Sequence, residues 1–109
     1  MAYNVLIVED QSMPRQLFEI FVNSSDEFNH IASLSDASLA LTLCQNQKID
    51  LILMDVYTAQ ESNGLTAAEE IKKHFPNIKV IIVTSMPEYS WIEKAKSIGV
   101  DSFWYKETN

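Results

Sequence analysis

The chain has 109 residues, of which 47% are hydrophobic, so it can form one domain around a single core but is too short for several domains. Its 15 acidic residues outnumber its 8 basic ones, and the net charge of −7 excludes the basic surface that contacts with a nucleic-acid backbone require, so we expect DNA binding only through another domain. No apolar run approaches the ~20 residues of a membrane span, and the N-terminus lacks a signal-peptide pattern, so we expect a cytoplasmic protein that contacts no membrane.

Five short apolar segments predict β-strands along the chain. The continuous runs at 5–8, 51–54 and 80–83 are typical of strands buried on both faces, whereas the weaker run at 30–32 suits an edge strand. The aromatic segment 103–105 predicts the fifth strand. Four of these segments are followed directly by polar residues of interest: 5–8 by Glu9 and Asp10, 51–54 by Asp55, 80–83 by Thr84, and 103–105 by Lys106.

Apolar residues at helical spacing predict a helix in each connection between these strands. The first helix spans 13–23, the second ends near Asn46, the third carries an apolar stripe from 65 to 75, and the fourth follows Pro87. The lone Cys44 lies in the apolar pattern of the second helix. It has no partner for an internal disulfide, and we interpret it as a small buried apolar residue rather than a reactive thiol.

Polar residues and glycine mark the ends of these helices. Ser12 is expected to cap the first helix, and Asp36, with Ser35 before it, to cap the second. Thr66 and Glu69 have the spacing of a capping box at the start of the third helix. Gly99 is expected to end the fourth helix.

Strands that alternate with helices of this length predict an α/β fold with a parallel sheet and right-handed crossovers. The expected architecture is a flavodoxin-like doubly wound five-stranded sheet in the order 2-1-3-4-5, formed by residues 1–109 as one domain. In this order the first and third strands lie side by side. The carboxyl ends of the strands, where ligands bind in such sheets, would then bring the polar residues that end them to one edge.

Three carboxylates are expected to meet at this edge of the sheet, from Glu9, Asp10 and Asp55. Taken singly, each has an ordinary explanation as a helix cap or turn residue. Together they would repel one another unless a cation lies between them, and oxygen ligands suit Mg²⁺, with Mn²⁺ as an alternative. An incoming phosphoryl group could then be attacked by Asp55, while Lys106 pairs with its oxygens and Thr84 donates a hydroxyl hydrogen bond.

The chain resembles the receiver domains of two-component response regulators. The resemblance rests on four segments in the family's order: Val8-Glu9-Asp10, Leu53-Met54-Asp55, Val83-Thr84-Ser85 and Tyr105-Lys106. It implies that Glu9, Asp10, Asp55 and the backbone carbonyl of Tyr57 hold Mg²⁺. It also implies that Asp55 accepts phosphate from the phosphohistidine of a sensor kinase or phosphotransfer protein, without catalytic turnover.

The same resemblance implies a switch and an output. Thr84 would move to engage the phosphoryl group, and Phe103 matches the aromatic residue whose rotamer follows that movement; the ordinary explanation of Phe103 is core packing. The loop after Asp55 is one residue longer than usual, with Ala59 where proline is common. Glu107 after Lys106 is typical of receivers joined to a helix-turn-helix output domain, which predicts a transcription regulator.

Other classes of protein fit less well. Glu9 and Asp10 would repel the phosphate of a flavin, and the chain has only two glycines, too few for a dinucleotide fingerprint or a P-loop. Tyr57 stands where a haloacid-dehalogenase-like phosphatase needs a second aspartate. The main alternative is a receiver-like interaction module that works without phosphate.

The directions of the crossovers also predict an uncovered face. Three helices should share one face of the sheet and the first helix should lie alone on the other, which one helix cannot cover. We therefore expect a receiver cut short, whose natural protein continues through a fifth helix, and a chain that associates with itself through that face or is marginally stable.

Overall fold

The computed structural model describes residues 2–58, 62–85 and 89–106. Its centre is a five-stranded parallel sheet in the order β2-β1-β3-β4-β5, which confirms the predicted topology. The strands are β1 (Tyr3–Val8), β2 (Phe28–Leu34), β3 (Leu51–Asp55), β4 (Lys79–Thr84) and β5 (Ser102–Tyr105).

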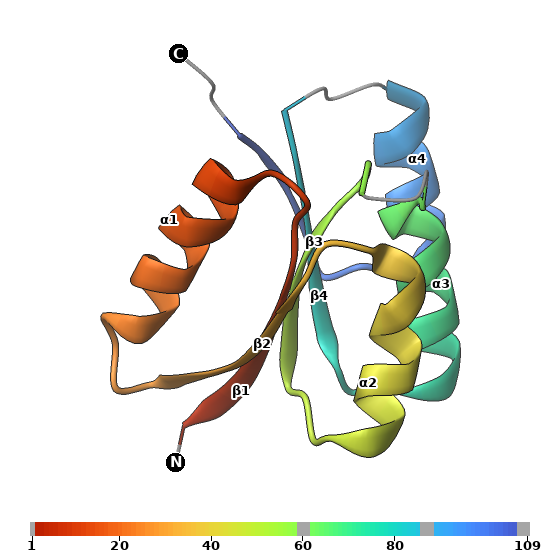
Figure 1. Ribbon diagram of the computed structural model, residues 1–109. Helices are drawn as coiled ribbons and strands as arrows, with labels where there is room; N and C mark the ends of the chain where they lie inside the picture. The colour runs from red at the N-terminus through yellow and green to blue at the C-terminus, as the bar shows by residue number, and fades with distance from the viewer. Residues whose placement is uncertain (1, 59–61, 86–88, 107–109) are drawn as a thin grey trace.

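Helices cover the two faces of this sheet unequally (Figure 1). The helix α1 (Ser12–Asn23) lies alone on one face. The opposite face carries α2 (Ala40–Asn46), which a 3₁₀ turn η1 (Ala37–Leu39) precedes, together with α3 (Gly64–His74) and α4 (Tyr89–Ile98). The right-handed crossover rule predicts this division. Within the described part of the chain, no helix is both long and apolar enough to cross a membrane.

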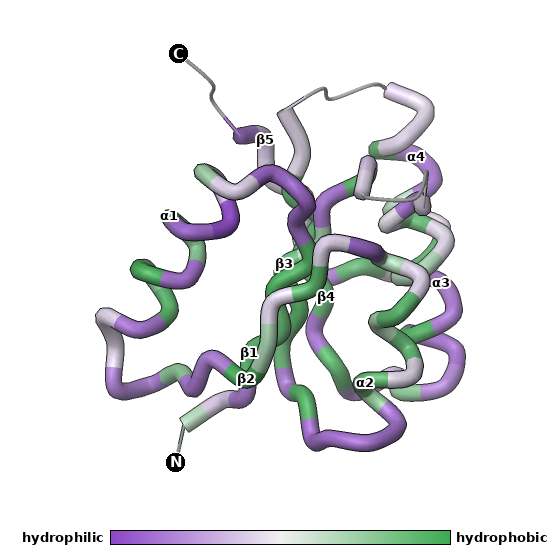
Figure 2. Tube along the Cα trace, viewed as in Figure 1, coloured by the Kyte–Doolittle hydropathy of each residue, from purple (hydrophilic) through white to green (hydrophobic). Residues whose placement is uncertain are grey.

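Two layers of apolar side chains lie between the sheet and the helices. Figure 2 shows that hydrophobic residues are concentrated along the strands. Alternate residues of each strand point to opposite faces, so Leu6 and Val8 of β1 join the larger layer under α2, α3 and α4. Val5 and Ile7 join the smaller layer, where Val22 of α1 packs. The central strands are therefore buried on both sides, as their continuous apolar runs predict.

The helix caps differ from the prediction at two of three positions. Ser12 lies inside α1, whose N-cap is Gln11 without a side-chain hydrogen bond. The third helix is capped by Asn63, whose side chain accepts from the amides of the second and third residues of α3, so the capping box of Thr66 and Glu69 is wrong. Asn63 begins the helix earlier because its backbone is extended and its side-chain oxygen reaches these amides. The predicted cap Asp36 is confirmed, at the start of η1.

One strand boundary also differs from the prediction. Strand β2 is longer than the predicted 30–32 because it pairs with β1 along its whole length, with a register shift between Val5 and Leu6. Gly99 follows α4 with φ +87°, as expected for a glycine that ends a helix. Cys44 is buried, and burial raises the pKa of its thiol to about 11, which confirms its interpretation as an unreactive packing residue. Pro87 lies outside the described residues.

Candidate metal and phosphoacceptor site

The candidate site lies where β1 and β3 end side by side. Their register pairs Val8 with Met54, so the next residues, Glu9 and Asp55, reach the same edge of the sheet. The chain leaves β1 toward one face of the sheet and β3 toward the other, because α1 and α3 cover opposite faces. Doubly wound sheets bind ligands at this position, where the chain diverges from two neighbouring strands.

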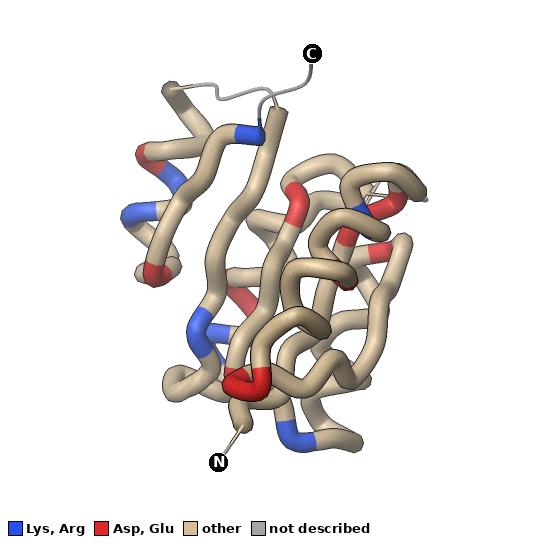
Figure 3. Tube along the Cα trace, turned by 90° about the vertical axis from the view of Figure 1, so that its left-hand side faces the viewer, with Lys and Arg blue, Asp and Glu red and all other residues tan. Residues whose placement is uncertain are grey.

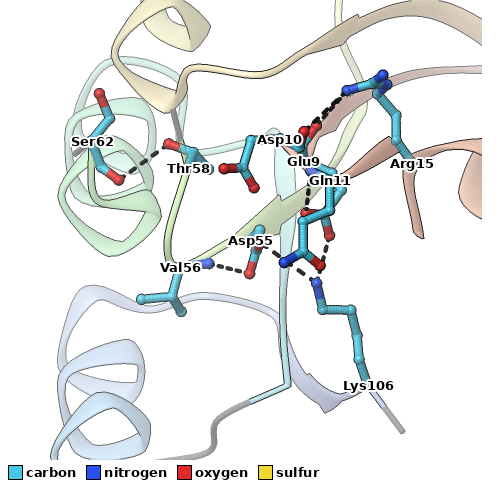
Figure 4. Close-up of polar contacts among 9 residues, drawn as sticks. All are labelled: Glu9, Asp10, Gln11, Arg15, Asp55, Val56, Thr58, Ser62 and Lys106. Carbon is cyan, nitrogen blue, oxygen red and sulfur yellow. Dashed lines mark hydrogen bonds and ion pairs between the residues drawn. The ribbon is translucent and has the colours of Figure 1, made fainter. Parts of the chain in front are cut away.

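Three carboxylates converge at this edge of the sheet (Figure 4). Glu9, Asp10 and Asp55 each present one carboxylate oxygen, and these oxygens lie within 4.8 Å of one another. Glu9 is 0% exposed and Asp55 is 8% exposed, whereas Asp10 faces solvent. A group of oxygen donors, two of them buried and one open to water, matches the ligand set that a hard divalent cation prefers.

Lys106, the residue after β5, brings a positive charge to the same site. Its Nζ lies 2.5 Å from Oε1 of Glu9 and 3.5 Å from Oδ2 of Asp55, so the shorter ion pair is with Glu9. The ammonium group is buried almost as deeply as the carboxylates. A buried ion pair of this kind is costly to break, because removing one partner leaves the other charge without compensation.

Asp55 is held in one orientation and is difficult to ionise. Its Oδ1 accepts a hydrogen bond of 2.8 Å from the backbone amide of Val56. Burial raises the pKa of Asp55 to about 7, and the neighbouring Glu9 carboxylate raises it as well, against the lowering effects of Lys106 and the Val56 amide. Burial, together with the neighbouring Glu9 carboxylate, therefore favours the protonated form of Asp55 more than in a free side chain.

The remaining predicted site residues lie on β4, on β5 and in the loop after β3. Thr84 ends β4 and is buried, and its backbone carbonyl accepts a hydrogen bond of 2.7 Å from the amide of Lys106. Tyr57 follows Asp55 by two residues, and its ring meets Trp91 of α4 edge-on, with the ring centroids 4.8 Å apart. Phe103 packs against the larger apolar layer. Their proposed roles as switch or ligand remain predictions, and Ala59 and Glu107 lie outside the described residues.

Two sets of hydrogen bonds fasten the loop that carries Glu9 and Asp10, and neither of them was predicted from the sequence. Arg15 in the first turn of α1 donates from Nη1 to the backbone carbonyls of Glu9, at 3.3 Å, and Asp10, at 3.4 Å. The amide of Gln11 donates to Oε2 of Glu9 at 3.2 Å. A lysine or arginine in a first helical turn has no pattern that reveals such a contact, because it depends on how the strand turns into the helix.

A second set of hydrogen bonds fastens the loop after Asp55. Thr58 Oγ1 accepts from the amide of Ala37 at 2.9 Å and donates to the carbonyl of Ser62 at 3.1 Å. Ser62 Oγ in turn donates to Oδ1 of Asp36 at 2.5 Å, and this bond is the largest cause of a lowered pKa at Asp36. Both described ends of the loop are thus tied to η1, which fixes where the chain leaves Asp55.

Gly64 is a further site residue that sequence reasoning did not single out. Its amide donates a hydrogen bond of 2.6 Å to the carbonyl of Val56. A Cβ atom at this position would lie 1.8 Å from the backbone oxygen of Asp55 and 2.8 Å from its carbonyl carbon. Only glycine therefore lets α3 start so close to the end of β3. The sequence holds one indication that this position matters, because the chain contains only two glycines.

A doubly wound parallel sheet with three carboxylates and a lysine at the meeting point of its first and third strands defines a class of signalling domain. The family model described as the response regulator receiver domain matches residues 5–109, and the chain belongs to this family.

Several known response regulators are similar to this chain in sequence or in fold. The response regulator protein VraR of Staphylococcus epidermidis is 34% identical over 109 residues, which are 100% of this chain and 52% of VraR. The crystal structure of a LuxR-family DNA-binding response regulator from Staphylococcus aureus has a TM-score of 0.88 at 30% identity, covering 98% of this chain and 88% of that one. The Mn²⁺-bound form of the response regulator Rcp1 has a TM-score of 0.86 at 22% identity, covering 98% and 83%. The chain spans about half the length of the curated relatives it matches.

The raised pKa of Asp55 predicts a pH-dependent stability in metal-free buffer. Its pKa of about 7 in the folded chain lies above the value of about 3.9 in the unfolded chain, so its stabilising contribution is complete below pH 4 and is lost as pH rises through 7. Asp55→Asn should therefore stabilise the chain at pH 8, by on the order of 2 kcal/mol, and much less at pH 5. Urea unfolding with a chelator present measures this, and Asp26→Asn, in the turn after α1, is the control for removing one carboxylate.

The close approach at Gly64 predicts a damaged site after a small substitution. Gly64→Ala should lower the free energy of unfolding by about 2 kcal/mol or more, because the new methyl group must displace the backbone of Asp55. Gly99→Ala is the matched control: a Cβ there meets nothing within 4 Å, and only the positive φ is strained, at a cost of about 1 kcal/mol. A Gly64→Ala chain as stable as the wild type would contradict the close approach.

Proposed function

We propose that this chain is a phosphoacceptor receiver that takes a phosphoryl group from a histidine kinase onto Asp55 in a Mg²⁺-dependent reaction and thereby switches an output domain. The observation that carries the proposal is the convergence of Asp55 with Glu9, Asp10 and Lys106 from the ends of three strands. Each residue taken alone has an ordinary structural explanation. Their meeting at one edge of the sheet supports a site for a cation and a phosphoryl group.

The donor atoms fit a divalent cation. Glu9, Asp10 and Asp55 would hold it with carboxylate oxygens, and the backbone carbonyl of Tyr57 would be a further ligand. A bound Mg²⁺ would neutralise the repulsion among the carboxylates and draw phosphoryl oxygens toward Asp55. Mn²⁺ has the same preference for oxygen donors, and the relative Rcp1 is known in a Mn²⁺-bound form.

In the transfer step, a carboxylate oxygen of Asp55 forms a bond to phosphorus while the bond from phosphorus to the donor's imidazole nitrogen breaks. The electron pair of the broken bond stays on that nitrogen, and the product is an acyl phosphate on Asp55. The Val56 amide keeps the carboxylate in one orientation during the approach, which reduces the entropic cost of the reaction. Lys106, now 3.5 Å from Oδ2, would pair with the added phosphoryl oxygens.

The switch would follow from groups beside the acyl phosphate. The hydroxyl of Thr84 would donate to a phosphoryl oxygen, and Phe103 would change its packing in response. The chain is altered by the reaction rather than regenerated at once, so it acts stoichiometrically, with its own dephosphorylation as the only return. Lys106→Ala should still accept phosphate but transmit the switch poorly.

The partners follow from this chemistry. A sensor histidine kinase or a phosphotransfer protein would supply the phosphoryl group in the cytoplasm. The relative from Staphylococcus aureus is a DNA-binding response regulator, and the matched curated relatives are about twice as long as this chain. We therefore propose that the natural protein contacts DNA through an output domain and regulates transcription.

The phosphoacceptor can be tested directly by mass spectrometry. Incubation with phosphoramidate or acetyl phosphate and Mg²⁺ should add one phosphoryl group to the wild-type chain and none to Asp55→Asn. Asp50→Asn, which removes a carboxylate at the opposite end of β3, is the control and should accept phosphate normally. Phosphate found on a serine or threonine instead would contradict the proposed mechanism. A wild-type chain that stays unmodified would favour a receiver-like interaction module that works without phosphate.

The metal site predicts a stabilisation by Mg²⁺. A cation that binds only the folded chain, present at a hundred times its Kd, should raise the free energy of unfolding by about 2.7 kcal/mol. Asp10→Asn should remove most of this gain, and because Asp10 is exposed the variant should still fold. Asp26→Asn should respond to Mg²⁺ like the wild type. Thermal melts that do not change with millimolar Mg²⁺ would count against the site.

A further inference from the structure

The described ends of the loop after β3 pair with each other around Tyr57. The Gly64 amide donates to the carbonyl of Val56 at 2.6 Å, and the Thr58 amide donates to the carbonyl of Ser62 at 3.1 Å. These two bonds flank an antiparallel bridge between Tyr57 and the N-cap residue of α3. In such a pair the bonds lie before and after the bridged residues, so the backbone groups of Tyr57 itself point away from the opposite segment.

The direction of the Tyr57 carbonyl is tied to that of the next amide. The carbonyl of Tyr57 and the N–H of Thr58 belong to one planar trans peptide unit, in which they point in opposite directions. Because the Thr58 amide is aimed at the carbonyl of Ser62, the Tyr57 carbonyl must be turned to the other side. Any contact that fixes Thr58 therefore also fixes this carbonyl.

The side chain of Thr58 supplies two such contacts. Thr58 is 6% exposed, and its Oγ1 accepts a hydrogen bond of 2.9 Å from the Ala37 amide in η1. The same hydroxyl donates to the carbonyl of Ser62 at 3.1 Å, as Figure 4 shows. The hydroxyl thus joins a backbone donor of η1 to a backbone acceptor of the loop, and a buried partner left without its hydrogen bond is costly. The peptide between residues 57 and 58 has little freedom to turn.

We propose that Thr58 is a positioning residue for the cation site, whose hydroxyl holds the Tyr57 carbonyl in place for Mg²⁺. This inference rests on the proposed function, in which that carbonyl is a ligand beside the three carboxylates. Hydrogen-bond partners outside a set of metal ligands orient those ligands, and the loss of one weakens metal binding by roughly 10–100-fold. Thr58 acts through the backbone, since its own hydroxyl is committed to Ala37 and Ser62.

Titration of the chain with Mg²⁺ in a calorimeter tests the proposal. Thr58→Val removes the hydroxyl with little change in volume, and the Kd for Mg²⁺ should rise by about tenfold. Thr58→Ser keeps a hydroxyl for both hydrogen bonds and should bind Mg²⁺ as the wild type does. Thr66→Val makes the same chemical change at an exposed position of α3, so it is the matched control and should also bind like the wild type.

The acidity of the chain requires a baseline for these titrations. The net charge is −7, and acidic positions are spread over the side of the molecule that Figure 3 shows, so Mg²⁺ will also collect weakly at other carboxylates. Titrations at about 0.15 M salt screen these exposed charges. Asp10→Asn, which lacks one of the three clustered carboxylates, gives the binding that remains outside the site.

The effect of the hydroxyl on Tyr57 can also be measured without metal. The Tyr57 ring meets Trp91 edge-on, with the centroids 4.8 Å apart, and in Trp104→Phe the remaining tryptophan is Trp91. Thr58→Val in this background should shift the Trp91 emission to the red, because the Tyr57 ring no longer covers it in one position. Thr58→Ser should leave the emission unchanged.

The outcomes separate this inference from the proposed function. A wild-type chain that binds Mg²⁺ and a folded Thr58→Val that binds it equally well would overturn this inference alone. Unchanged Trp91 emission in Thr58→Val, or weakened binding in Thr58→Ser equal to that in Thr58→Val, would overturn it too. A wild-type chain that binds no Mg²⁺ would overturn the proposed function as well. If Thr58→Val does not fold, Thr58→Ala leaves room for a water at the Ala37 amide and provides the same comparison.

Discussion

The structure depends above all on the compensation of one fully buried negative charge. Glu9 has no access to solvent, and it lies beside Asp55, which is also buried. Lys106 provides the nearest positive charge, 2.5 Å away, while the Gln11 amide binds the second oxygen of Glu9. The sheet order makes this possible, because it brings the ends of β1, β3 and β5 to one edge. The lysine thereby offsets part of the free-energy cost of burying neighbouring carboxylates at the candidate cation site.

The sequence predicted the parts of the fold that depend on periodicity and chain order. Continuous apolar runs identified the central strands, and their connections implied the order 2-1-3-4-5, which the structure confirms. The same order predicted that Glu9, Asp10 and Asp55 meet. These features follow from repeated patterns, in which an error at one residue changes little.

The features that the sequence did not predict depend on single competing contacts. Ser12 and Gln11 compete for one cap, and Asn63 precedes the expected capping box, so a shift of one to three residues decides the outcome. The contacts of Arg15 with the carbonyls after β1 require the three-dimensional turn between strand and helix. The close approach at Gly64 is of the same kind, because it joins two elements whose distance no local pattern specifies.

The ion pair between Glu9 and Lys106 joins residues 97 positions apart, almost the whole length of the chain. During synthesis, β1 leaves the ribosome long before Lys106 exists. A nascent chain that has formed its first four strands would bury Glu9 without its lysine, which for a buried ion pair deprived of one partner costs about 3–5 kcal/mol. We therefore expect the site to gain this stabilisation only when the fifth strand has joined the sheet. An unfinished chain would lack it at the edge of the sheet where the candidate site lies.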